Sequence, residues 1–167
     1  MEHKNPDMVG RRSELLATVA LTRRLDIEVH RMDLDSGIDF MGIIRPEPDE
    51  ELQGLLLFGV VVKGTAKPLP SHLAAEKFFR AISSKSGSIN GKYFLPVIVL
   101  LFSMNHDEGY FSWLVEPDVE TEALIQHPDL TFTPFDLKQL DQMTSRIKKW
   151  YEQLSVSIAP PTLLGKS

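Results

Sequence analysis

The feature that most limits what this chain can fold into is a pair of almost continuous apolar runs, at positions 55–62 and 95–102. Both are rich in β-branched and aromatic residues, and turn-forming or polar residues bound each of them. A short, continuous apolar run of this kind is typical of a strand that is covered on both faces. The two runs therefore predict a central sheet that lies between layers of helix.

Weaker β patterns surround these runs. Residues 27–32 alternate between apolar and polar side chains, which predicts a strand with one covered face. A second strand is expected at 38–44, after a turn built on residues 35–37. The aromatic segment 110–115 follows the second apolar run across a short turn, and this arrangement predicts a β-hairpin.

Three helices are expected from apolar periodicity and from capping residues. The first covers residues 9–24, and the second runs from the suitable N-cap Ser71 to about residue 84. The third is expected to start at Thr133, with Pro134 as its first helical residue, and to end near residue 154.

The expected order is thus a helix, three strands, a helix, two strands and a further helix. This order predicts an α/β fold with a mixed central sheet flanked by helices, plus a C-terminal helix. We expect a single domain over residues 1–154 and a C-terminal tail over residues 155–167.

Composition excludes several kinds of site. Cysteine is absent, so a disulfide framework, a thiolate zinc site, an iron–sulfur site and a cysteine nucleophile are all excluded. The longest apolar stretch, residues 93–102, falls well short of the ~20 residues that a membrane-spanning helix needs. The first twenty residues also lack the order of basic, apolar and small residues of a secretory signal. We therefore expect a cytoplasmic protein with no membrane partner.

Charge is distributed in blocks along the chain, whose net charge is −5. Residues 26–51 hold nine acids against two arginines, and residues 106–130 hold seven acids and no lysine or arginine. Between these blocks, residues 63–92 carry six basic residues against one acid. The net charge argues against a protein that coats nucleic acid through bulk charge. The basic segment has two open interpretations, a solvated helix face or a strip that faces phosphates.

Three residues have the chemistry that metal-dependent hydrolysis of a phosphodiester requires, which is hard oxygen ligands with a cation nearby. Asp39 lies where a turn leads into a strand, and Lys63 ends the next strand, so a hairpin would bring both to one end of the sheet. Glu14 of the first helix is the third candidate. Structural interpretations stay open for all three, because Asp39 could cap a turn and the other two could be solvated surface residues.

The segments around these residues resemble a bacterial domain family of unknown function in the restriction-endonuclease-like superfamily, which is named for its PD-(D/E)XK motif. The resemblance covers residues 9–118 and is carried by four segments: SGIDF at 36–40, GVVVKGT at 59–65, LPVIVL at 95–100 and YFSWLV at 110–115. The core of that superfamily has the order α-β-β-β-α-β, which is also the order expected above from the residues themselves.

The resemblance implies a role for each candidate. Asp39 would be the motif aspartate, Lys63 the lysine of the (D/E/Q)-x-K triplet, and Glu14 the glutamate of the first helix. Asp39, Glu14 and the backbone carbonyl of Val62 would hold Mg²⁺ or Mn²⁺, and Lys63 would stabilise the charged transition state. The triplet is incomplete, because Val61 stands where the family has Glu, Asp or Gln, and an isopropyl group supplies no metal ligand.

Two functions follow as expectations. The first is a nuclease-like protein that acts on nucleic acid, DNA in particular, with a metal-dependent phosphodiesterase site that is reduced or lost; Lys67, Lys77 and Arg80 would then contact phosphates. The second is a non-catalytic binding or assembly module that keeps the nuclease fold, in a phage-defence or mobile-element context. A homodimer and a different protein partner both stay open. The apolar stripe of the last helix fits packing on the sheet as well as pairing with a second copy.

Overall fold

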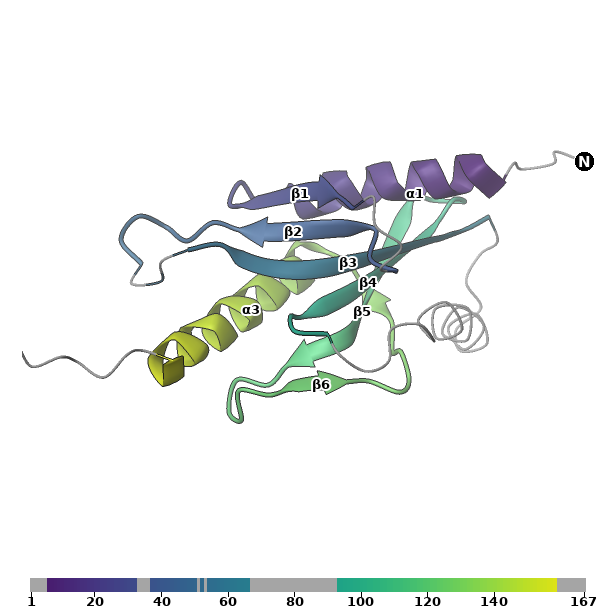
Figure 1. Cartoon of the computed structure of the whole chain (residues 1–167). Coiled ribbons are helices and arrows are strands. Elements are labelled where there is room, and N and C mark those ends of the chain that lie inside the picture. Colours follow the sequence, from purple (N-terminus) through teal and green to yellow (C-terminus); the bar gives the residue numbers. More distant parts are fainter. Residues whose placement is uncertain (1–5, 33–36, 51, 53, 67–92, 159–167) are drawn as a thin grey trace, which may run out of the picture.

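A computed structural model describes residues 6–32, 37–50, 52, 54–66 and 93–158. In these ranges the chain forms a mixed sheet with two helices, α1 (Pro6–Leu21) and α3 (Leu137–Ile158) (Figure 1). This is the α/β architecture that the sequence predicts. The helix expected at 71–84 lies outside the described residues.

The sheet has seven strands in the order β1-β2-β3-β4-β5-β6, and β7 pairs with β5 off this path. Their bounds are β1 (Ile27–Arg31), β2 (Phe40–Ile44), β3 (Leu56–Thr65), β4 (Val97–Ser103), β5 (Glu108–Pro117), β6 (Leu124–Gln126) and β7 (Thr133–Pro134). The β3–β4 pair is parallel, and the other pairs are antiparallel. The expected hairpin of the second apolar run with the aromatic segment is therefore confirmed as β4–β5.

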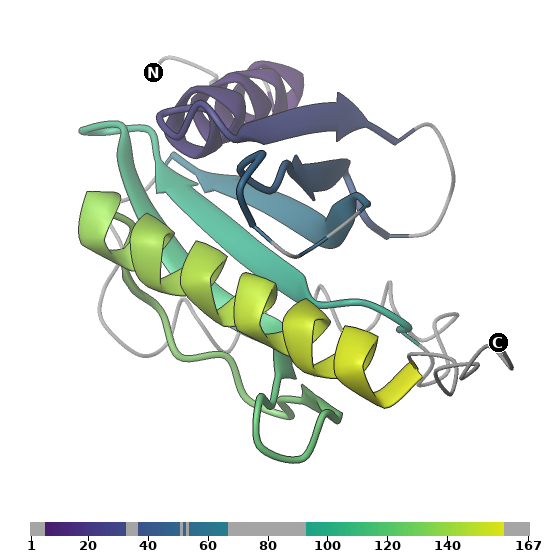
Figure 2. The ribbon, with the colours of Figure 1, turned by 90° about the vertical axis from the view of Figure 1, so that its left-hand side faces the viewer.

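The two apolar runs become the centre of the sheet, and their side chains alternate between two apolar layers. The first, here called the helix side, packs with α1 and α3; its strand members include Phe58, Val60, Val62, Ile98 and Leu100. The second, here called the far side, contains Val61, Val97, Val99, Leu114, Val115 and Leu130. Both helices thus cover the same face, and Figure 2 shows α3 lying over the sheet, in roughly the same direction as the teal strands behind it.

The start of α3 differs from the sequence prediction. Thr133 and Pro134 pair with β5 as strand β7, and the helix begins at Leu137. Its cap is Asp136, whose Oδ1 accepts a 2.8 Å hydrogen bond from the backbone N–H of Gln139. The prediction of Thr133 as the cap is wrong because pairing with β5 satisfies this backbone in another way. The helix continues to Ile158, so residues 155–158 are helical.

Buried polar groups fix α3 on the sheet in addition to its apolar face. The hydroxyl of Tyr151 donates a 2.6 Å hydrogen bond to the carbonyl of Leu57 in β3. The indole Nε1 of Trp150, which is buried, donates to the carbonyl of Glu122 at 3.1 Å. Neither described helix combines the length and the apolar content that a membrane span requires.

Candidate functional site

Asp39 directly precedes β2, and its backbone joins the two neighbouring strands. Its N–H donates to the carbonyl of Val60, and its carbonyl accepts from the N–H of Met32, both at 2.9 Å. The residue before it, Ile38, packs on the far side of the sheet, whereas the residue after it, Phe40, is buried on the helix side. The side chains on either side of Asp39 therefore face opposite sides of the sheet, although its backbone stays between the strands.

The carboxylate of Asp39 turns toward β3. Its Oδ2 accepts a 2.7 Å hydrogen bond from the backbone N–H of Val62. In an antiparallel pair the N–H and carbonyl of one residue point to the same neighbour, so the carbonyl of Val62 also faces the edge on which Asp39 lies. Two of the groups that the resemblance puts in one site, the Asp39 carboxylate and the Val62 backbone, are thus neighbours.

Lys63 lies one residue further along β3. The prediction that it ends the strand is wrong, because parallel pairing with β4 holds the chain in the sheet as far as Thr65. Lys63 is half-buried, and strand alternation places it on the far side, the side of Val61. Lys63 is thus next to Val62 along the chain, and Asp39 lies beside Val62 across the β2–β3 pair.

Val61 occupies the position where the resemblance requires a carboxylate or amide. Its side chain is only 3% exposed and belongs to the far-side apolar layer, opposite Val99 of β4. An acid at this position would lose most of its hydration, and the half-buried Lys63 lies two residues along β3 on the same side. The surroundings of Val61 thus suit an apolar side chain.

Glu14 lies on α1, and its partner in the described structure is Arg31 at the end of β1. Glu14 Oε2 is 3.4 Å from Arg31 Nη2. The two side chains line a hollow of about 420 Å³, together with Arg11, Leu15, Thr18 and Phe40. Sequence analysis missed Arg31, although its position at the end of a predicted strand marks it as a neighbour of the residues that open the next strand.

The donor groups are poorly placed to share a Mg²⁺ ion, which is usually held by one or two carboxylates together with water. Oδ2 of Asp39 is bonded to a backbone N–H, and the carboxylate of Glu14 is paired with an arginine. Within residues 6–32, 37–50, 52, 54–66 and 93–158, no three His, Asp or Glu side chains are close enough to share a metal ion. The expected phosphate contacts Lys67, Lys77 and Arg80 lie outside these ranges.

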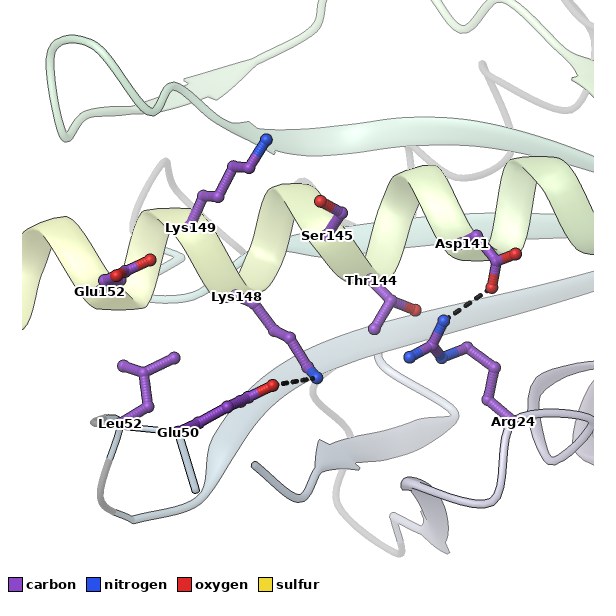
Figure 3. A pocket seen from close by; sticks show the side chains of 9 residues that line it. All are labelled: Arg24, Glu50, Leu52, Asp141, Thr144, Ser145, Lys148, Lys149 and Glu152. Atoms are coloured by element: carbon purple, nitrogen blue, oxygen red, sulfur yellow. Dashed lines mark hydrogen bonds and ion pairs between the residues drawn. The ribbon is translucent and has the colours of Figure 1, made fainter. Parts of the chain in front are cut away.

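A second hollow, of about 500 Å³, lies between α3 and the connection that follows β2 (Figure 3). On one side of it, Arg24 donates hydrogen bonds to Asp26 at 2.8 and 2.9 Å and to Asp141 at 2.6 Å. On the other, Lys148 Nζ lies 3.2 Å from Glu50 Oε1 and 3.4 Å from Asp26 Oδ2. The hydrogen bonds from Arg24 lower the pKa of Asp26. Arg24 and Lys148 each face two carboxylates, so this cluster connects α3 to the β1 end of the sheet. Lys149, the third cation of the lining, belongs to none of these ion pairs.

A third hollow, of about 880 Å³, lies between α3 and the end of β5, with Trp113 in its wall. The carboxylate of Glu116 is paired with Arg146 of α3 and lies 2.5 Å from Nε2 of His127. These contacts hold the end of β5 against α3. The sequence did not reveal this cluster, because its members are far apart along the chain.

No family model matches the chain, and no similar protein was found among curated proteins or solved structures. The likeness to the restriction-endonuclease-like superfamily is thus carried by the residues quoted above. The function has to be inferred from the side chains at the Asp39 end of the sheet.

Proposed function

We propose that this chain is a nucleic-acid-binding module with a restriction-endonuclease-like architecture, in which the metal-dependent phosphodiesterase site has been lost. The observation that carries the proposal is the burial of Val61, at 3% exposure, in an apolar layer where the resemblance requires a metal ligand. DNA is the expected ligand, as the resemblance implies.

The order of elements supports the architecture. Helix α1 is followed by the antiparallel strands β1, β2 and β3, and β4 returns parallel to β3. A parallel pair requires a long crossover between its strands, and residues 66–96 supply that length. The described elements are therefore compatible with an α-β-β-β-α-β core.

The polar contacts of the candidate residues support the loss of chemistry. Each of the two acids that the resemblance places at the metal has a polar partner in the structure. Asp39 bonds to the N–H of Val62, and Glu14 faces Arg31. Both acids are thus in contacts that stabilise the fold without a metal.

Binding and cleavage assays on the intact chain test the proposal. We expect salt-sensitive binding to single-stranded or duplex DNA, measured by fluorescence anisotropy, because phosphate contacts release counterions. We expect no cleavage of either DNA form or of RNA in the presence of Mg²⁺ or Mn²⁺. Asp39→Ala and Lys63→Ala are the test variants, and Asp49→Ala, an exposed acid after β2, is the control.

The opposite result would favour a residual nuclease. A residual nuclease is supported by one observation: the Asp39 carboxylate, the Val62 backbone and Lys63 are neighbours at one end of the sheet. Cleavage that both Asp39→Ala and Lys63→Ala abolish, and that Asp49→Ala keeps, would contradict the proposed loss. A chain that binds no nucleic acid at all would refute the proposed function as a whole.

A further inference from the structure

The hollow beside α1 contains two arginines and a glutamate, and its charges are arranged unlike those of the other hollows. Arg31 is 68% exposed and has one carboxylate partner, Glu14, at 3.4 Å. Arg11 is exposed, and no ion pair joins it to any residue in the part of the chain that the structure describes. In the hollow between α3 and the β2 connection, by contrast, each ion-paired cation faces two carboxylates. The hollow beside α1 therefore holds more positive charge than its single glutamate can neutralise.

The Glu14–Arg31 pair is weak enough for an anion to replace it. Its 3.4 Å separation exceeds the 2.7–3.2 Å range of an N–H···O hydrogen bond. Ion pairs in contact with solvent contribute only about 0–1 kcal/mol. A phosphate offers a guanidinium several strong acceptor oxygens in bidentate geometry, so it competes well with a single distant carboxylate.

The rest of the lining suits a backbone unit of a nucleic acid. The hollow of about 420 Å³ lies in the range of small-ligand sites. Leu15, which is 68% exposed, gives it an apolar rim against which a sugar can pack. Its floor includes Phe40, the residue that directly follows Asp39. The hollow is thus adjacent to the end of the sheet at which the Asp39 carboxylate lies.

We infer that Arg11 and Arg31 together hold a phosphate of the nucleic-acid backbone, and that Glu14 competes with this phosphate for Arg31. This inference rests on the proposed function and gives it a contact point on α1 and β1. In place of the metal ligation that the resemblance implies, Glu14 limits the affinity for nucleic acid. Neutralising Glu14 should therefore strengthen nucleic-acid binding. If Glu14 were a metal ligand that supports binding, neutralising it would weaken binding.

The test is the anisotropy titration of a labelled DNA oligonucleotide at several salt concentrations. Arg11→Gln and Arg31→Gln should each weaken binding about threefold to tenfold and reduce the slope of log K against log salt by about 0.7–0.9, the change for one lost phosphate contact. Glu14→Gln should strengthen binding about twofold to fivefold, the equivalent of a solvent-exposed ion pair. All these side chains are at least partly exposed, so thermal melts should stay close to that of the wild type.

The matched control is Arg45→Gln. Arg45 is also exposed and also paired with one acid, Glu28, but it follows the opposite end of the β1–β2 pair. Its substitution should leave affinity and salt slope unchanged. If the wild type binds DNA and the Arg11 and Arg31 variants behave like the Arg45 control, or if Glu14→Gln weakens binding, this inference is overturned while the proposed function stands. If the wild type itself binds no DNA or RNA, the proposed function fails first.

Discussion

Replacing Val61 by glutamate introduces an acid at the position where the resemblance to the superfamily would require one, and the structure predicts that this variant is strongly destabilised. The Val61 side chain is 3% exposed, so the substitution forfeits about 1.5–3 kcal/mol of apolar burial. A carboxyl group in the far-side layer that does not reach Lys63 on the same side adds roughly 1–3 kcal/mol, even as the neutral acid. The expected loss of about 2.5–6 kcal/mol is a large share of the ~5–15 kcal/mol that stabilises a typical domain.

The pH dependence of this loss identifies its cause. Burial raises the pKa of the introduced carboxyl above the ~4.3 of a glutamate in the unfolded chain. The folded state then binds the proton more tightly, so the extra cost of charge is absent below about pH 4 and grows as the pH rises toward the raised pKa. Urea unfolding of Val61→Glu at several pH values, with Val61→Gln as the uncharged control, measures this difference. Each tenfold increase in proton affinity corresponds to about 1.4 kcal/mol.

The result that would refute this reasoning is a Val61→Glu variant as stable as the wild type at neutral pH. A rise in its urea midpoint on addition of Mn²⁺, absent in Val61→Gln, would show that position 61 lies in a metal site that lacks one ligand. The proposed loss of the phosphodiesterase site would then be wrong.

Two further predictions concern the attachment of α3. Asp26→Asn should lower stability at neutral pH by about 1–3 kcal/mol, because Arg24 loses its charged acceptor at 2.8 and 2.9 Å. Arg24 lowers the pKa of Asp26 in the folded state. The stability difference between Asp26→Asn and the wild type should therefore be complete above the pKa of an unfolded aspartate, ~3.9, and vanish as the pH falls through the lower pKa of the folded state. Thermal melts whose difference stays the same at low pH would contradict this. Tyr151→Phe should cost about 0.5–1.5 kcal/mol in urea unfolding, because the carbonyl of Leu57 loses a donor at 2.6 Å, and equal midpoints would show that water replaces the hydroxyl.

The sheet could be predicted from the sequence where burial determines the pattern. β4 is buried at every position and is apolar from Val97 to Phe102, so its location follows from the sequence alone. The short strand β6 is partly or fully exposed at all three positions, and neither apolar periodicity nor a continuous run marks it. Thr133 and Pro134 suit both a helix start and a strand, and only the presence of β5 beside them decides between the two.

The candidate site shows the same division between local and long-range information. The sequence places Asp39 before a strand, and the hairpin geometry of that strand brings it to β3, as expected. The pairing of Glu14 with Arg31 depends on how α1 lies over the end of β1, which no local pattern encodes. The burial of Val61 could be inferred only in part, since the apolar run indicates a covered strand but not which side chain meets which layer.

The hydrogen bond from Tyr151 to Leu57, together with the ion pair between Arg24 and Asp141, has a consequence for how the polypeptide reaches its native state. Each contact joins the last helix to the first half of the chain, so large loops must close before either can form, and such topologies fold slowly. During synthesis, the part of the helix-side surface that α3 covers stays exposed to water until α3 has left the ribosome. We therefore expect the nascent chain to need protection from aggregation for most of its translation.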